Sequence, residues 1–406
     1  MRLLVVALGS RGDVVPALGL APALIAAGYE VTIAANPEFG GLVREAGAGF
    51  VALPGDARTI SSFPRGWRSS PRFLAAQARA LTTYLIDAVD AVVDAAAGHH
   101  VLLPNLTARF ADDVAEGLGI PSIGLYAQPV EPTAAFPPIL LHTARDLGGV
   151  ANRFSARVAM AVATPFHAAA RRARAAVGLP ARRRAPRLNR VLHGWSPHVL
   201  ARPVDWRPGL SVAGYWRLRI PPGWAPPAEL VDFLDAGEPP VLIGFGSMAA
   251  GQDGWLSDVV ARAVRGRRAI VQRGWAGLEA AGPDVLVVGD VPHDWLFPRV
   301  AAVVHHGGAG TAGAVFSAGV PGVAVPVYAD QPLWADRARR LGTGPDPLPF
   351  TRLTGSALAA RIDAVTTSPG ASNFRGAAAE LAGRIAADDA VGPVLAALAE
   401  LPGSPG

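Results

Sequence analysis

Short apolar runs alternate with helical patterns along the chain, and this alternation predicts an α/β fold. Residues 2–8 read as a buried strand, and residues 14–27 follow as a helix that Gly28 closes. Further strands of the first half are expected at 30–35, 50–53, 101–106 and 122–126, with Pro37 opening the helix after the second of them. Strands that alternate with helices over short loops indicate a parallel sheet covered on both faces.

The second half repeats the pattern, with strands expected at 241–245, 269–272, 285–288, 302–304 and 323–327. Two such units predict two Rossmann-like, doubly wound domains that face each other across a cleft. The proline-rich stretch 203–240 is expected to link a first domain at 1–202 to a second at 241–385, with a C-terminal helix and tail at 386–406. Parallel sheets of this kind bind ligands beyond the carboxyl ends of their strands, so the cleft is the expected site.

Composition narrows the classes of protein. The chain has 406 residues, of which 50% are hydrophobic and 17% charged, so it is long enough for two cores and little of it is expected to be disordered. The absence of cysteine excludes disulfides, thiolate nucleophiles and cysteine metal sites. The first apolar run is too short for a signal sequence, and no run approaches the ~18 residues of a membrane span. A cytoplasmic protein is expected.

The positive charge is unevenly distributed. All 37 basic residues are arginine, and residues 145–207 hold thirteen of them against Asp146 and Asp205. Such a block could contact an anionic membrane or an acidic ligand, whereas a solvated helical face is the simpler interpretation. Peripheral membrane contact therefore stays open. Nucleic acid is not expected as a partner, because no aromatic residues alternate with the arginines.

The strongest chemical signal is the run Val303-Val304-His305-His306-Gly307-Gly308-Ala309-Gly310-Thr311. An apolar strand enters glycines and a helix, expected at 312–318, begins at once. Such a turn presents unpaired backbone N–H groups at the positive end of a helix dipole, which is where proteins bind anions. Thr311 and a histidine can add further donors to a phosphate. A tight strand-to-helix turn with ordinary glycines is the structural alternative, but it does not explain two adjacent histidines.

Several other phosphate or metal chemistries are excluded or disfavoured. The glycines at 9 and 12 do not have the spacing of a dinucleotide fingerprint, and Asn36 and Pro37 stand where that motif needs an acidic residue. A Walker-type loop is impossible without lysine. The chain has no Asp-x-Asp pair of the kind that binds a metal ion. No metal ligand and no cofactor are predicted.

Four ordered motifs resemble those of family 1 glycosyltransferases, more narrowly the bacterial antibiotic-type and sterol-type branch. They are Leu8-Gly9-Ser10-Arg11-Gly12-Asp13-Val14-Val15-Pro16, Gly244-Phe245-Gly246-Ser247-Met248, Gly289-Asp290-Val291-Pro292-His293, and the His-His-Gly-Gly-Ala-Gly-Thr run with Pro326-Val327-Tyr328-Ala329-Asp330-Gln331-Pro332 behind it. The resemblance spans residues 8 to about 341. It implies the GT-B fold, in which the first domain holds the acceptor and the second holds a nucleotide diphosphate sugar.

The resemblance also implies roles for single residues. The diphosphate would be held by His306, by the amides of Gly308, Ala309, Gly310 and Thr311, and by the hydroxyl of Ser247, with Ser10 also near the donor. Asp330 and Gln331 would bind the sugar hydroxyls. The base edge would meet the backbone of Val291, with Trp275 and His293 as walls. For Trp275 a place in the hydrophobic core is an equally good interpretation.

Asp13 has two candidate roles. Its pattern alone favours an N-cap for a helix that begins near Val14, a role that aspartate often fills. The resemblance implies instead that its carboxylate is the general base of an inverting, metal-independent displacement. One residue can serve both roles.

The acceptor is the least determined part of the prediction. The candidate acceptor loops, 61–72 and 128–147, are rich in Pro, Phe, Ala and Leu, which favours a small hydrophobic natural-product aglycone. The donor base is expected to be uracil or thymine, with guanine as a further option. A sterol or lipid acceptor is the alternative; an epimerase or a non-catalytic helper of the same fold fits the motifs less well. Sequence does not indicate the oligomeric state.

Overall fold

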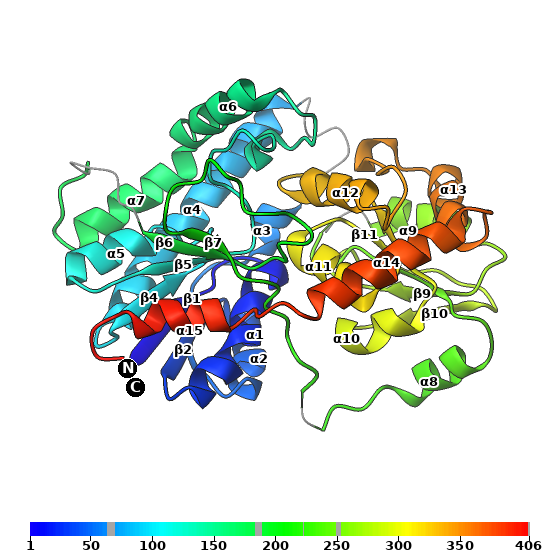
Figure 1. Ribbon diagram of the computed structural model, residues 1–406, viewed down its shortest axis with the longest axis horizontal. Helices are drawn as coiled ribbons and strands as arrows, with labels where there is room; N and C mark the ends of the chain where they lie inside the picture. The colour runs from blue at the N-terminus through cyan, green and yellow to red at the C-terminus, as the bar shows by residue number, and fades with distance from the viewer. Residues whose placement is uncertain (63–69, 183–188, 222, 249–252, 405–406) are drawn as a thin grey trace.

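The computed structural model describes residues 1–62, 70–182, 189–221, 223–248 and 253–404, which form two α/β lobes side by side (Figure 1). Each lobe is built around a parallel sheet with helices packed against it. The apolar runs of the sequence become the strands, because strands covered on both faces are buried along their whole length. The α/β class with parallel sheets is confirmed.

The first lobe contains the strands up to β7. Strands β1 (Arg2–Val6), β2 (Glu30–Ala35), β3 (Gly49–Ala52) and β4 (Val101–Pro104) lie in the order β3-β2-β1-β4. A bridge between Leu102 and Ser122 joins them to a three-stranded sheet of β5 (Ile123–Tyr126), β6 (Arg190–His193) and β7 (Leu210–Val212). The helices are α1 (Arg11–Ala26), α2 (Gly40–Glu45), α3 (Arg58–Ser61), α4 (Pro71–Ala96), α5 (Ala111–Leu118), α6 (Gly149–Ala161) and α7 (Thr164–Ala176), with short turns η1 (Pro37–Phe39) and η3 (Ile139–Leu141).

The second lobe has one five-stranded parallel sheet in the order β10-β9-β8-β11-β12. Its strands are β8 (Val241–Gly244), β9 (Ala269–Gln272), β10 (Val285–Val288), β11 (Ala302–His305) and β12 (Gly322–Ala324). Its helices are α8 (Ala228–Asp235), α9 (Asp253–Ala263), α10 (His293–Leu296), α11 (Ala309–Ala318), α12 (Gln331–Arg340), α13 (Gly355–Thr366) and α14 (Ala371–Ile385), with η4 (Phe297–Arg299) and η5 (Phe350–Arg352). The last helix, α15 (Gly392–Ala399), leaves this lobe (Figure 1).

All ten predicted strands are present, and those at 30–35, 269–272 and 285–288 agree residue for residue. The helix predicted at 14–27 begins three residues earlier, at Arg11, because Ser10 has extended backbone and acts as the N-cap. Asp13 is therefore not a cap before Val14; it lies in the first helical turn. The strands β6 and β7 were not predicted, since they are short and their surroundings are rich in arginine and proline.

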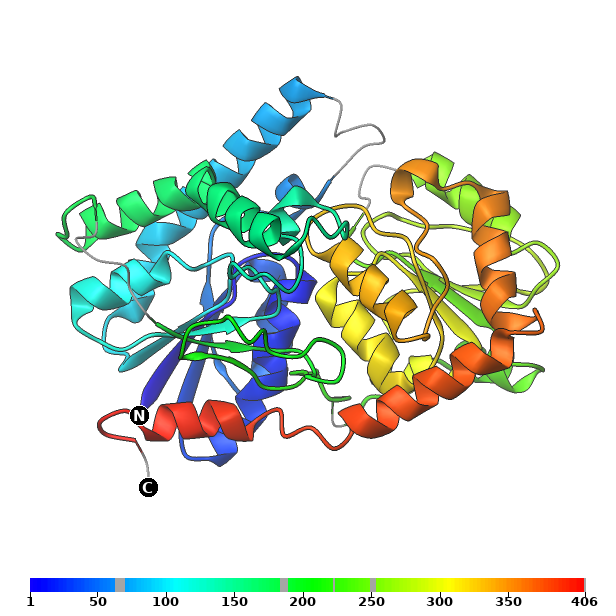
Figure 2. The same cartoon turned by 45° about the horizontal axis from the view of Figure 1, so that its top comes forward.

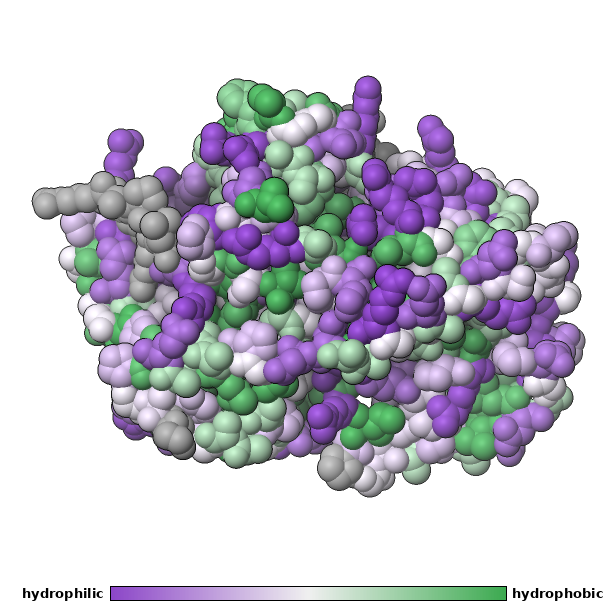
Figure 3. Space-filling model, viewed as in Figure 1, coloured by the Kyte–Doolittle hydropathy of each residue, from purple (hydrophilic) through white to green (hydrophobic). Residues whose placement is uncertain are grey.

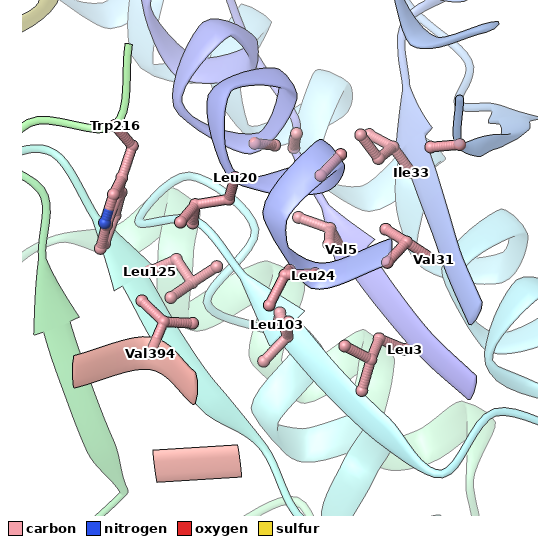
Figure 4. Close-up of a cluster of buried hydrophobic side chains, with 14 of the residues drawn as sticks. Leu3, Val5, Leu20, Leu24, Val31, Ile33, Leu103, Leu125, Trp216 and Val394 are labelled. Carbon is pink, nitrogen blue, oxygen red and sulfur yellow. The ribbon is translucent and has the colours of Figure 1, made fainter. Parts of the chain in front are cut away.

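The stretch 203–240, predicted as a linker, contains β7, which pairs with β6 of the first lobe, and later α8. The C-terminal helix α15 packs against the first lobe, where Val394 and Leu398 are buried with Leu103 and Leu125 (Figure 4). Fully burying each of these two side chains contributes roughly 1.5–3 kcal/mol. The C-terminus therefore ties the second lobe back to the first, while the predicted domain boundaries themselves stay a prediction.

The two lobes share a hydrophobic interface below the cleft. Phe136 and Trp195 of the first lobe belong to the same buried cluster as Phe316 and Trp334 of α11 and α12. Figure 2 shows these two helices on the side of the second lobe that faces the first. The helices that carry the candidate donor residues are thus packed against the first lobe.

Candidate active site

The end of β11 forms an open helix terminus. His305 ends the strand, Gly307 has a positive φ of 84°, and Gly308 is the N-cap of α11. A side chain at Gly310 would meet no atom within 4 Å, so there is open space in front of the first turn. The N–H groups of this turn have no acceptor inside the helix. Helix termini of this kind can bind anions, and Gly308, Ala309, Gly310 and Thr311 form this one.

His306 lies against this terminus. Its Nε2 is close to Gly308: a Cβ at that glycine would be 2.5 Å away. Its Nδ1 is buried and has no hydrogen-bond partner among the described residues. Burial lowers the pKa of His306 to about 4, so the ring is neutral at pH 7 and carries one N–H. A neutral imidazole at this place can donate one hydrogen bond to an anion at the helix terminus.

The neighbouring His305 has a different environment. Its Nδ1 accepts the N–H of Gly307 at 3.2 Å, and the ring is fully enclosed. Burial lowers its pKa to about 3. His305 therefore shapes the turn, while His306 borders the site.

The loop after β8 packs on the other side of His306. Gly246 has a φ of 57°, and a Cβ there would lie 3.4 Å from the His306 ring. The adjacent loop after β9 crosses so closely that a Cβ on Gly274 would lie 2.5 Å from the carbonyl oxygen of Gly246. Ser247 follows in the same tight turn, half-buried. Positive φ favours glycine at both 246 and 274, and at 274 the close approach of the Gly246 carbonyl oxygen also excludes a side chain.

The predicted base-binding residues lie at the ends of β9 and β10. The main chain of Val291 has no hydrogen-bond partner within the described parts of the chain, so its edge is available to a ligand. His293 stacks on Phe297 at 4.3 Å, and burial lowers its pKa to about 4, with Arg11 adding to the shift. Trp275 is partly buried against the core of the first lobe and has the guanidinium of Arg58 5.3 Å from its ring. This packing supports the interpretation of Trp275 as a core residue.

Asp330 and Gln331 begin α12. The Asp330 carboxylate accepts the indole N–H of Trp334 at 2.5 Å, and burial raises its pKa to about 6. Gln331 accepts the N–H of Val327 at 2.7 Å and of Tyr328 at 3.2 Å through Oε1. Its amide NH₂ group has no recorded acceptor in the described chain, so it is the half of the side chain available to a ligand.

Asp13 faces the cleft from α1. Its Oδ2 accepts the backbone N–H of Ser10 at 2.9 Å and the Ser10 hydroxyl at 3.0 Å, and Gln128 Nε2 lies 3.5 Å from Oδ1. A Cβ on Gly9, whose φ is 130°, would lie 2.5 Å from the same carboxylate. Burial raises the pKa of Asp13, although the hydrogen bonds from Ser10 and Gln128 oppose it. The result is a more basic carboxylate than an exposed aspartate.

The two walls of the cleft are close enough to interact. The charge of Asp13 helps to raise the pKa of both Asp330 and Tyr328. The main chain of Ala309, in the first turn of α11, acts in the opposite direction and lowers the pKa of Asp330. Helices α1 and α11 are themselves in contact, so the general-base candidate, a sugar-binding candidate and the start of α11 lie close together.

Sequence reasoning did not assign roles to four further residues near the candidate site. Gln128 follows β5, and its place at the carboxyl end of a parallel strand was the available signal. His142 accepts the N–H of Ala329 through Nδ1 at 2.8 Å, and Tyr328 lies beside it. Both His142 and Ala329 have positive φ, which no sequence pattern indicated. Arg11 and Asp290 add an exposed ion pair of 2.9 Å between the lobes.

The acceptor side is less completely described. Of the predicted acceptor loop 61–72, residues 63–69 lie outside the described residues. The second loop, 128–147, carries η3 and buried Val130 and Phe136, so part of its apolar surface serves the lobe interface. Within the described ranges no group of three or more His, Cys, Asp or Glu could hold a metal ion. None of the described helices is both long and apolar enough to cross a membrane.

Comparison with known proteins places this site in a family. Residues 3–164 match the glycosyltransferase family 28 N-terminal domain, and residues 269–401 match the erythromycin biosynthesis protein CIII-like C-terminal domain. The O-mycaminosyltylonolide 6-deoxyallosyltransferase of Streptomyces fradiae is 35% identical over 390 residues, which cover 91% of this chain and 90% of that protein.

The chain is also similar to a sterol 3-beta-glucosyltransferase of Arabidopsis thaliana, with 30% identity over 374 residues, 86% of this chain and 58% of the relative. It thus spans somewhat more than half the length of that plant protein. Among solved structures, the spinosyn rhamnosyltransferase SpnG has a TM-score of 0.67 at 22% identity, with 98% of this chain and all of that chain covered. These similarities and the two-lobed architecture show that the chain belongs to the GT-B glycosyltransferases, in the branch that holds antibiotic and sterol transferases.

Proposed function

We propose that the protein transfers a sugar, with inversion, from a nucleotide diphosphate sugar to a hydroxyl of a small hydrophobic natural product. The observation that carries the proposal is the contact between α1, which holds Asp13 in its first turn, and α11, whose N-terminus is the candidate anion site. Asp330, at the start of α12, is close enough for the charge of Asp13 to raise its pKa. A base on one wall and an anion site on the other are what a displacement at an anomeric carbon requires.

The donor side supplies leaving-group stabilisation. When the bond between the anomeric carbon and the diphosphate oxygen breaks, the bonding pair leaves with the nucleoside diphosphate. The N–H groups of Ala309, Gly310 and Thr311, the Ser247 hydroxyl and the His306 N–H would donate to the developing charge. Asp330 and the free amide of Gln331 would orient the sugar hydroxyls. Because these donors are held by the fold, they need little reorganisation during the reaction.

The acceptor side supplies the base. Asp13 would accept the proton of the acceptor hydroxyl as its oxygen attacks the anomeric carbon from the face opposite the diphosphate. Burial makes the Asp13 carboxylate more basic, and the Ser10 hydrogen bonds hold it in place. Attack from the opposite face inverts the anomeric configuration. No step needs a metal ion, so metal independence is part of the proposal.

The identities of donor and acceptor are proposed from the comparisons. SpnG has been solved with thymidine diphosphate and with the spinosyn aglycone, and the Streptomyces fradiae relative is named for O-mycaminosyltylonolide. These favour a thymidine or uridine diphosphate donor and a polyketide-like acceptor. A sterol is the second candidate, because the sterol glucosyltransferases match over most of this chain.

A transfer assay with paired donors and acceptors tests the proposal. Thymidine, uridine and guanosine diphosphates are first ranked by the rise in melting temperature that each causes, since a ligand of the folded state stabilises it. An α-linked donor of the preferred base should then give a β-linked product with a macrolide-type or a sterol acceptor, in the presence of excess chelator. Retention of configuration, or activity lost to chelator and restored by magnesium, would contradict the mechanism. Sugar isomerisation without acceptor would indicate an epimerase.

A further inference from the structure

A strip of apolar side chains lies exposed on α6. Val150, Phe154, Val158 and Val162 recur every four residues along this helix and its C-cap, so they share one side of it. Their exposed fractions are 88%, 67%, 45% and 67%. Single exposed apolar residues are ordinary on protein surfaces, but a continuous row of them marks a contact surface.

An apolar surface groove of about 480 Å³ borders the strip. Phe154 and Val158 form one side of it, and Leu81 of α4, Leu141 of η3 and Phe166 of α7 contribute to the rest. Figure 3 shows hydrophobic atoms gathered at the top of the molecule, where Figure 1 places α6. The strip and the groove together form one surface, which we call the α6 face.

The charge around the α6 face is predominantly positive. Residues 145–207 contain thirteen arginines against two aspartates, Asp205 and Asp146, and the latter accepts a hydrogen bond from Asn152 of α6. Some are already paired, such as Arg153 with Asp205 and Arg172 with Asp90. Arg145, Arg157 and Arg171 are exposed, and none has an ion-pair partner in the described part of the chain. On α6, Arg157 follows Phe154 by three residues and therefore borders the apolar strip.

We propose that the α6 face docks the protein on an anionic lipid bilayer. A bilayer surface offers both parts of the match: acyl chains for Val150 and Phe154, and phosphate groups for the arginine guanidiniums. A second copy of the chain fits less well, because a symmetric contact would bring the same unpaired arginines against each other. The strip and the flanking arginines are the two parts of a helix that lies in a membrane interface.

The position of the α6 face suggests a function for membrane docking. Leu140 and Leu141 of the groove directly precede His142, which bonds to Ala329 beside Asp330. The groove therefore adjoins the acceptor side of the cleft. An apolar acceptor that partitions into lipid would reach the cleft from the membrane side; this consequence rests on the proposed function, whereas the docking itself does not.

Vesicle flotation with the full-length protein tests the docking. The probe is vesicles of equimolar phosphatidylcholine and phosphatidylglycerol, compared with vesicles of phosphatidylcholine alone. The wild type should float with the anionic vesicles, with binding that falls as salt is raised. The variant Val150→Ser/Phe154→Ser/Val158→Ser should bind them at least about tenfold more weakly, because three membrane-buried side chains are lost. Arg157→Gln should weaken binding about fivefold, the value of one cationic side chain near an anionic surface.

Matched control variants distinguish binding through the α6 face from nonspecific binding to vesicles. Ile220→Ser removes an exposed apolar side chain in the segment before α8, on the opposite side of Figure 1 from α6, and Arg375→Gln removes an exposed arginine of α14. Neither should change vesicle binding, and melting temperatures should show that every variant is folded. Turnover of a water-soluble acceptor should be unchanged in the triple variant.

Three results would overturn the docking proposal: no flotation of the wild type, equal flotation of the triple variant, or a wild-type dimer that the triple variant dissociates while neither binds vesicles. Because flotation needs no substrate, the proposed transferase activity can fail without affecting this result, and the reverse also holds.

Discussion

The two walls of the cleft hold their reactive groups by different means. On the second lobe, the groups are main-chain N–H donors at the start of α11, with glycines at 246, 274 and 307 shaping the loops around them. On the first lobe, the candidate base is a side chain, Asp13, which the hydrogen bonds of Ser10 hold and whose pKa burial raises. The comparison teaches that a donor wall made of backbone depends on shape, while an acceptor wall made of side chains depends on individual functional groups.

The largest effect on turnover is expected from replacing Asp13, the candidate base of the first lobe. Asp13→Asn should lower kcat on the order of 100- to 10,000-fold, because asparagine cannot accept the proton. Its Oδ1 can still accept the Ser10 N–H, so the melting temperature should stay near that of the wild type. An acceptor with an aliphatic hydroxyl gives the sharpest assay, and Asp94→Asn, an exposed change on α4, is the matched control.

The pH profile adds a check on the same residue. Since burial raises the pKa of Asp13, the acid limb of kcat/KM should lie above the usual range of an aspartate. If Asp13→Asn kept the full turnover of the wild type, Asp13 would not be the general base and would have only a structural role in the first turn of α1.

The next largest effect is expected from His306, the imidazole that borders the start of α11. His306→Ala should cost about 2–4 kcal/mol in kcat/KM, as the loss of one preorganised donor does. His305→Ala is the matched comparison: it leaves the buried Gly307 N–H without its acceptor and should cost about 1–3 kcal/mol of stability. Steady-state kinetics and denaturant unfolding of both variants separate the roles. Wild-type kcat/KM in His306→Ala would place the diphosphate elsewhere.

Asp330 tests how far the two walls influence each other. Its pKa in the folded protein is raised from 3.8 to about 6, so its protonation stabilises the fold. This contribution is fully present below about pH 4 and is lost as the pH rises through about 6. Relative to Asp330→Asn, the wild type should therefore lose up to about 3 kcal/mol of stability between about pH 4 and pH 7. Urea unfolding at several pH values measures the difference; one that does not change with pH would show that Asp330 is not desolvated.

The smallest effect tests the shape of the donor wall. A Cβ at Gly310 meets nothing within 4 Å, so Gly310→Ala should fold as well as the wild type or gain up to about 1 kcal/mol. It should nevertheless raise the donor KM, because the methyl group enters the space proposed for the diphosphate. Gly308→Ala is the contrasting variant, since its Cβ would press on His306 at 2.5 Å and should lower stability as well. An unchanged donor KM in Gly310→Ala would argue against the proposed diphosphate position.

The sequence pattern was sufficient to predict those strands and turns that depend only on neighbouring residues. The strands β2, β9 and β10 are buried parallel strands, and such strands appear in a sequence as short apolar runs between turn residues. The glycine-rich start of α11 could be recognised because glycine and histidine types at that spacing have few other uses, although the helix begins at Ala309 and not at the predicted residue 312. The start of α1 was placed three residues late, since the pattern did not show that Ser10 caps the helix and that Asp13 turns back to it.

Contacts between segments that are distant in the sequence could not be predicted from the local pattern. Nothing in residues 386–406 indicated that α15 packs on the first lobe. The apolar residues of a helix predict that one face is buried, but they do not predict which surface it packs against. The same holds for Trp275, whose ring reaches the core of the other lobe. The bond between His142 and Ala329 joins residues 187 positions apart, both in left-handed backbone. Burial, and with it the shifted pKa values of Asp13, His306 and Asp330, arises only when segments distant in the sequence pack around these side chains.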